Sequence, residues 1–228
     1  MKIILMSDTH EQHRKFLLPE ADLLLHTGDF TFYGKPPAIV DFDEWLGGQL
    51  QVKEKIVIAG NHDLLFEDHP AEARKLLPSA IYLQDSGVEH NGWYIWGTPW
   101  QPWFLDWAFN IRSETVRGKK WALIPDNTDI LMVHSPPYGI MDETVDGRKV
   151  GCRALLNRIE EIQPRLVVFG HIHRNYGLFN DRKRFPRTLF VNASNCDETY
   201  DPVNKPIILN LDRDSLQFVS VPGRMKEA

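Results

Sequence analysis

The stretch RLVVFGHIH, residues 165–173, joins a strand-like apolar run to two histidines. Residues 166–169 are apolar and rich in β-branched side chains, which is typical of a buried strand. Gly170 follows, and His171 and His173 stand directly behind it. Imidazoles at the end of a core strand indicate that this end of the strand borders a polar site.

Seven further apolar runs recur along the chain, and many of them end in Gly, Asp, Asn or His. They lie at residues 2–8, 21–29, 55–61, 128–135, 188–194, 206–212 and 216–221. The early runs are almost continuously apolar, as in strands that are covered on both faces. Residues 38–50 and 151–164 carry apolar side chains at helical spacing and predict helices. The alternation predicts an α/β fold with a largely parallel core, and the closely spaced last runs predict hairpins in a mixed sheet.

The composition is that of an ordinary globular protein of 228 residues, with 43% hydrophobic residues and a net charge of -5. We expect a single domain over residues 1–228. An acidic chain is not expected to bind nucleic acid in general, and no apolar run is long enough to span a membrane. Two cysteines without CxxC spacing, and no signal-peptide pattern, predict free thiols and a cytoplasmic location.

Polar side chains follow five of these runs at the point where each run ends. They are Asp8 and His10, Asp29, Asn61 with His62 and Asp63, His134, and His171 with His173. Because sites in open α/β sheets form outside the carboxyl ends of the strands, we expect all of them at one edge. Close carboxylates repel each other and clustered imidazoles lack partners, so the set predicts divalent metal. Mixed Asp, His and Asn ligands suit Mn, Fe, Zn or Ni, and this many ligands suits two ions that share one carboxylate.

Each fragment has a simpler explanation when it is taken alone. A DxH is common on surfaces, GNHD favours a turn, and His134 alone would fit a satisfied core histidine. The ordered set of five fragments, each at a predicted strand end, favours the metal site instead. His26 is expected in the core or behind the ligands, and His13, His69 and His90 on the surface.

The five fragments together resemble the calcineurin-like metallophosphoesterases. The ordered family pattern is DxH, GDxxxxG, GNH[DE], a lone His and GHxH. This chain has DTH (8–10), GDFTFYG (28–34), GNHD (60–63), VHSPP (133–137) and GHIH (170–173). It is most similar to the subgroup of metallophosphoesterase-domain-containing proteins that are expressed in brain and to their microbial relatives. The resemblance implies a four-layer α/β/β/α sandwich with a mixed, largely parallel double sheet.

The resemblance also implies a role for each ligand around two divalent ions. The first ion is held by Asp8, His10, Asp29 and His173, and the second by Asp29, Asn61, His134 and His171, with Asp29 as the bridge. An extended chain would place His171 and His173 on one side, toward one shared ion. The family pattern divides them between the two ions. A hydroxide that bridges the ions attacks phosphorus, because metal lowers the pKa of bound water from ~15.7 toward ~7.

The resemblance assigns His62 to the phosphate rather than to a metal. It protonates the leaving oxygen or stabilises the charge that builds there, since imidazole titrates near neutral pH. Asp63 could hydrogen-bond to His62 or to a metal ligand and orient it. The alternative is that Asp63 forms a turn or a helix cap.

The segment WYIWGTPWQPWFLDWAF (93–109) holds five of the seven tryptophans, and Pro99 and Pro102 exclude a regular helix through it. Trp100 and Trp103, together with Asn61 and His62, are expected to contact the substrate, for example by stacking on a nucleobase. The alternative for the tryptophans is that they fill the core.

The resemblance implies a dinuclear metal-dependent phosphodiesterase that acts on small nucleotide-type diesters such as cyclic nucleotides. Protein phosphatases of this superfamily carry GDxVDRG, and the Asp-Arg pair of that motif is missing from GDFTFYG. Two alternatives stay open: a phosphomonoesterase of the same fold, and a non-catalytic protein that binds metal or nucleotide. Exposed strand edges or tryptophans would support a homodimer.

Overall fold

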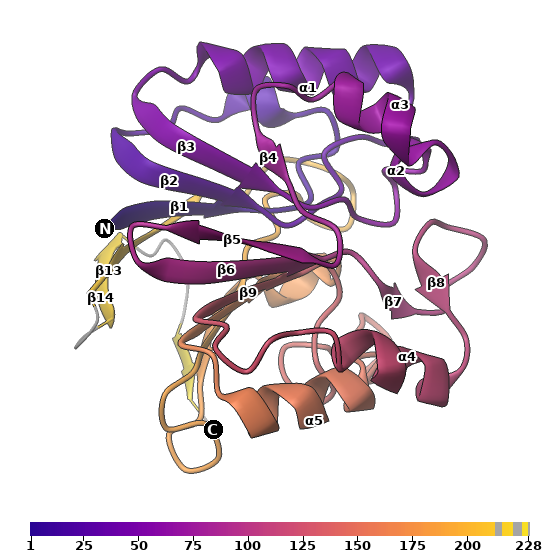
Figure 1. The fold of residues 1–228 in the computed structure, drawn as a ribbon, viewed down its shortest axis with the longest axis vertical. Coiled ribbons are helices and arrows are strands. Elements are labelled where there is room, and N and C mark those ends of the chain that lie inside the picture. The colour runs from indigo at the N-terminus through magenta and orange to yellow at the C-terminus, as the bar shows by residue number, and fades with distance from the viewer. Residues whose placement is uncertain (213–215, 221–224, 228) are drawn as a thin grey trace.

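The computed structural model describes residues 1–212, 216–220 and 225–227, and it places two β-sheets face to face with helices outside them (Figure 1). The first sheet has the order β14 (Leu216–Ser220), β13 (Ile207–Leu211), β1 (Lys2–Met6), β2 (Ala21–His26), β3 (Val52–Val57) and β4 (Ile81–Tyr82). The second has the order β15 (Met225–Glu227), β11 (Gly177–Asn180), β12 (Leu189–Asn192), β10 (Leu166–Phe169), β9 (Ile130–Val133), β6 (Trp93–Thr98) and β5 (Ser86–His90). A short pair, β7 (Gln101–Pro102) and β8 (Asn110–Ile111), lies apart from both sheets.

Alternation along the strands explains the layering. In β1, Ile3 and Leu5 point into the core between the sheets, whereas Ile4 and Met6 point to the helices, and all four are fully buried. Both faces of a strand are therefore apolar, which gives the continuous apolar runs of the sequence. The predicted four-layer α/β/β/α architecture is confirmed.

The outer layers are formed by helices on each side (Figure 1). The first sheet is covered by α1 (Pro36–Gly48), α2 (Leu65–Asp68), α3 (Pro70–Lys75) and the 3-10 turn η1 (His13–Lys15). The second is covered by α4 (Glu114–Trp121) and α5 (Arg153–Ile162). Within the described ranges, none of the helices has the length and hydropathy that a membrane span requires.

Helices α1 and α5 confirm the two predicted helical segments, and local chemistry sets their ends. α1 starts at Pro36, whose fixed φ suits the first helical position. α5 ends where Gln163 adopts a left-handed φ of 47°, directly before Pro164. The apolar side chains of α5, such as Leu155 and Ile159, pack on the second sheet.

The strand directions bring the predicted site together. β1, β2 and β3 are parallel, and so are β6, β9, β10 and β12, so each group has its carboxyl ends at one edge. The two sheets meet at that edge through a bridge between Ser7 and Ser194. β13 runs antiparallel to β1 and to β14, which confirms the mixed, hairpin-like end of the chain.

Three features of the fold differ from the sequence expectations. The hairpin of β5 and β6 was not predicted, because β5 (SGVEH) is a half-buried edge strand with little apolar signal. Strand β11 was also missed. His13, expected on the surface, is fully buried, where its Nε2 pairs with Asp41 (2.9 Å) and its ring packs against Phe42.

Candidate metal centre

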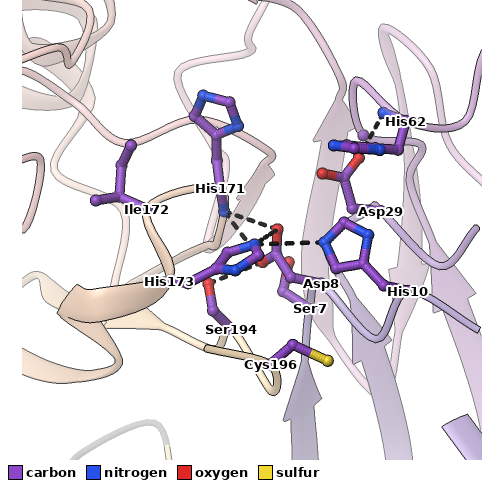
Figure 2. Close-up of polar contacts among 12 residues, drawn as sticks. Ser7, Asp8, His10, Asp29, His62, His171, Ile172, His173, Ser194 and Cys196 are labelled. Carbon is purple, nitrogen blue, oxygen red and sulfur yellow. Dashed lines mark hydrogen bonds and ion pairs between the residues drawn. The ribbon is translucent and has the colours of Figure 1, made fainter. Parts of the chain in front are cut away.

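The predicted ligands gather at the shared carboxyl edge of the two sheets (Figure 2). Three groups of side chains have ligand atoms that all lie within 4.8 Å of one another: Asp8, His10 and His173; His10, Asp29 and His62; and Asp29, His134 and His171. Asn61 joins the third group, since its Oδ1 lies 3.0 Å from His134 Nε2. The groups share members and therefore form one continuous cluster.

Asp8 is the centre of the first group. His173 Nε2 lies 3.3 Å from Asp8 Oδ1 and 3.3 Å from His10 Nε2. The backbone N–H of His171 (3.0 Å) and the hydroxyl of Ser194 (2.8 Å) donate to the Asp8 carboxylate (Figure 2). Burial raises the pKa of Asp8, but the hydrogen bond and charge of His173 hold it well below its usual value. Asp8 is therefore an ionised, fully oriented carboxylate.

Asp29 is the carboxylate of the third group. Its Oδ2 lies 3.2 Å from His134 Nε2, and its Oδ1 accepts the backbone N–H of His62 (2.8 Å). Burial lowers the pKa of His134, but the charge of Asp29 outweighs it and raises that pKa to about 9. At His171 burial prevails, and the charge of His134 adds to it, so the pKa falls to about 3.

Backbone carbonyls orient three of the imidazoles. His62, His134 and His173 donate from Nδ1 to the carbonyl oxygens of Phe32 (2.9 Å), Thr27 (2.9 Å) and Asp197 (2.7 Å). A carbonyl oxygen only accepts, so Nδ1 carries a proton in each ring, and Nε2 is the nitrogen that can bind a cation once it is deprotonated. Metal-binding histidines are usually oriented in this way.

The donor set fits divalent cations. His10 Nε2 and His173 Nε2 face each other at 3.3 Å, and His10 Nδ1 is buried with no hydrogen-bond partner among the described residues. A cation beside the Asp8 carboxylate would accept the lone pairs of these two Nε2 atoms and offset the charge of the carboxylate. Imidazole nitrogens with carboxylate and amide oxygens suit first-row divalent ions, as the sequence indicates.

Left-handed backbone accompanies the ligands. Asp8, His10, Asp29 and His171 have φ values of 50°, 40°, 54° and 66°, in a region where residues other than glycine cost of order 1–3 kcal/mol each. The extended conformation considered for residues 171–173 is wrong, because His171 is left-handed and the 3-10 turn η2 (His173–Asn175) follows. His171 and His173 accordingly belong to different groups.

Two glycines leave room for the carboxylates. A Cβ on Gly60 would overlap Asp29 Oδ1 and crowd the His134 ring, and a Cβ on Gly170 would overlap Asp8 Oδ2 and Ser7 Oγ. The glycines of GNHD and GHIH are therefore required because a ligand from a neighbouring strand end packs directly on each of them.

Asp63 connects the two loops that carry Asp29 and Asn61. Its carboxylate accepts the backbone N–H groups of Asp29 (2.8 Å), Gly60 (2.9 Å) and Thr31 (3.0 Å), and the Thr31 hydroxyl (2.7 Å). Burial and the charge of Asp29 raise the pKa of Asp63 to about 7. These contacts make Asp63 a positioning residue, and its predicted part in catalysis, by orienting His62 or a ligand, stays a prediction.

A cavity of about 230 Å³ opens over the cluster. Its lining combines site residues with apolar and polar neighbours: Asp29, Asn61, His62, Phe104, Thr144, Val145, His171, Ile172, His173, Arg174, Glu198 and Tyr200. Of the described residues, neither Trp100 nor Trp103 belongs to this lining. Trp100 donates to Asp85 (2.8 Å), and Trp103 lies under Arg112 (3.9 Å), so a substrate contact by these indoles stays a prediction.

A sixth strand end, that of β12, also borders the cluster. Ser194, Asp197 and Tyr200 all follow β12 and contact the cluster, although none of them was predicted. The run at 188–194 ends in NAS, a polar end like the other five, and this was the signal available in the sequence.

The chain belongs to the calcineurin-like phosphoesterase family, whose model matches residues 1–175. It is 41% identical over 235 residues to human "Metallophosphoesterase domain-containing protein 1", a match that covers 92% of this chain and 71% of that protein. These findings confirm the resemblance and its subgroup.

A more distant relative and a solved structure also resemble this chain. The chain is 25% identical over 171 residues to a "3',5'-cyclic-nucleotide phosphodiesterase" of Nostoc sp., with 70% of this chain and 59% of that protein covered. The solved structure of GAP50 from Plasmodium has a TM-score of 0.53 at 12% identity, over 92% of this chain and 80% of that chain, and shows the same fold.

The close packing at Gly170 predicts the effect of adding one methyl group. Gly170→Ala should lower the free energy of unfolding by about 1–3 kcal/mol, because the added methyl group would overlap Asp8 Oδ2 and Ser7 Oγ. Gly118→Ala is the matched control: Gly118 lies inside α4 with open space at its Cβ, so alanine should leave the stability unchanged or raise it by up to about 1 kcal/mol. Urea denaturation of both variants measures the difference, and equal unfolding free energies would refute the role of close packing at Gly170.

Proposed function

We propose that this protein is a dinuclear metal-dependent phosphodiesterase that hydrolyses small phosphodiesters of the nucleotide type. The observation that carries the proposal is the position of Asp29. Its carboxylate belongs both to the group with His10 and to the group with His134 and His171. A carboxylate shared between two ligand groups is what a bridging ligand between two ions requires.

In this proposal each ion takes one end of the cluster. The first is held by Asp8, His10, Asp29 and His173, and the second by Asp29, Asn61, His134 and His171. When bound, two divalent ions supply Lewis acidity toward phosphate oxygens and a water molecule that ionises near neutral pH. The amide of Asn61 contributes an oxygen ligand without a further negative charge, which favours an anionic substrate.

His62 is the proposed general acid. Its Nδ1 donates to the Phe32 carbonyl, and its side chain lies in one ligand group with His10 and Asp29. The ring is fixed between the indole of Trp107, 4.0 Å away between ring centroids, and the edge of His10, 4.8 Å away. A protonated His62 would deliver its Nε2 proton to the leaving oxygen as the phosphorus–oxygen bond breaks.

The cavity supports a diester rather than a monoester. Apolar side chains of Phe104, Val145, Ile172 and Tyr200 lie beside the ligands, where a second ester group of a diester would extend. The name of the Nostoc relative points to the same substrate class. We retain the cytoplasmic location and the homodimer as predictions.

Two chromogenic substrates test the reaction. With Mn²⁺, bis-p-nitrophenyl phosphate should be hydrolysed with a higher kcat/KM than p-nitrophenyl phosphate. A preference for the monoester would make the protein a phosphomonoesterase, and no cleavage of either ester with any divalent metal would refute the enzyme proposal.

Replacing His62 separates chemistry from metal binding. His62→Ala should retain the wild-type metal content by elemental analysis and lose about 10²–10⁴-fold in kcat, the usual contribution of a general acid. His134→Ala is the contrasting variant, since it removes a proposed ligand and should lose metal. A His62→Ala protein that fails to bind metal would show that His62 is a ligand instead.

A further inference from the structure

Tyr200 is an aromatic residue whose side chain packs on the candidate centre. Its ring contacts three site histidines, with centroid distances of 4.7 Å to His10, 5.9 Å to His173 and 6.2 Å to His62. It is nevertheless 39% exposed and lines the cavity. An aromatic face that is partly open to a cavity is available to a ligand.

The turn that carries Tyr200 is tied to a ligand. Tyr200 has a left-handed φ of 64° and donates its backbone N–H to the Asp197 carbonyl (3.0 Å). The same carbonyl accepts His173 Nδ1 (2.7 Å). The Asp197 carboxylate closes the turn by accepting the N–H groups of Thr199 (2.9 Å) and Asp201 (3.0 Å). The backbone that carries the Tyr200 ring is therefore fixed relative to His173.

Phe104 stands on the other side of the cluster. Its ring lies 5.8 Å from the ring of His171, a member of the Asp29 group, whereas Tyr200 lies on the Asp8 group. The side chain of Asn110 holds the segment of Phe104 in place. Its Oδ1 accepts the backbone N–H of Phe104 (3.0 Å), and its Nδ2 donates to the carbonyls of Leu105 (2.9 Å) and Trp107 (2.8 Å). Phe104 is 48% exposed, but the hydrogen bonds of Asn110 fix the backbone that carries it.

The remaining edge of the cavity is also held in place. Arg174 donates to the Thr144 carbonyl (2.7 Å), which fixes the segment of Val145 beside the turn that follows His173. Thr144, Arg174 and Glu198 add polar groups to the lining. A preformed pocket with apolar walls and a few polar groups is the usual form of a small-ligand site.

We infer that Tyr200 and Phe104 are the two aromatic walls that select phosphodiesters carrying a planar aromatic group, such as a nucleobase, on the ester that remains bound to phosphorus. The inference rests on the proposed function and adds the residues that choose the substrate. Tyr200 and Phe104 would contact the ester group that stays on phosphorus and not the leaving group. They would therefore change which diester is preferred without changing which bond breaks.

Two diesters with the same leaving group test the walls. Thymidine 5′-(p-nitrophenyl phosphate) and methyl p-nitrophenyl phosphate each take up one water, release p-nitrophenol and leave a phosphate monoester. The wild-type protein with Mn²⁺ should favour the thymidine ester in kcat/KM by roughly 10-fold or more, as base stacking on aromatic side chains allows. Tyr200→Ala and Phe104→Ala should each bring this ratio toward one.

Two control variants guard against structural effects. Tyr200→Phe keeps the ring and should keep the ratio. Leu105→Ala removes an exposed apolar side chain (55%) next to Phe104 that, among the described residues, does not line the cavity, and it should also keep the ratio. Unchanged ratios in both alanine variants at Tyr200 and Phe104, with both diesters still cleaved, would overturn the inference and leave the proposed function intact.

Calorimetry gives a readout that does not need turnover. Thymidine 5′-monophosphate should bind the Mn²⁺-loaded protein more tightly than methyl phosphate, and Tyr200→Ala should remove that difference. If no diester is cleaved but this difference in Kd holds, the walls stand and the catalytic proposal fails. Equal Kd values for the two ligands in the wild-type protein would refute the inference that Tyr200 and Phe104 bind a planar aromatic group.

Discussion

Two buried carboxylates, Asp8 and Asp29, are surrounded by imidazoles at the edge where two sheets meet. Such charges are tolerated in an interior only when they are paired and hydrogen-bonded. The surrounding loops meet that need: backbone N–H groups of His171 and His62 donate to the two carboxylates. The arrangement of the strand ends, the glycines beside them and the left-handed backbone of the ligands all follow from bringing these groups together. The same two carboxylates would supply the negative charge that offsets two bound cations.

The loops are also bonded to one another, which makes the cluster one unit. Asp63 joins the Asp29 loop to the Asn61 loop, and Asp197 joins the turn after β12 to His173. The Trp-rich segment takes part through its backbone, since Ala108 donates to the Asn61 carbonyl (3.1 Å). Its tryptophans have different surroundings: Trp93 and Trp96 are buried in the core, Trp103 lies under Arg112, and Trp107 packs on His62. The segment therefore supports the site mainly as a scaffold.

The layers and the ligands could be predicted from the sequence because both depend on short-range patterns. Continuous apolar runs predict strands covered on both faces, and parallel strands bring their carboxyl ends to one edge, which predicts that Asp8, Asp29 and His134 lie together. The division of these strands between two sheets followed only from the family resemblance. Tyr200 and Phe104 could not be placed in this way. Their turns are held by local hydrogen bonds to Asp197 and Asn110, but their place beside the cluster depends on long-range contacts: the Asp197 carbonyl also accepts His173 Nδ1, and Phe104 lies beside His171. His13 was misplaced for the same reason, since its partner Asp41 comes from a distant helix.

The central claim is that the cluster binds two ions that share Asp29. Anomalous diffraction from crystals of the Mn²⁺-loaded protein tests it most directly. We expect two anomalous peaks, one beside Asp8, His10 and His173 and the other beside Asn61, His134 and His171, with the Asp29 carboxylate in contact with both. A single peak under metal saturation, or two peaks without Asp29 between them, would contradict the account.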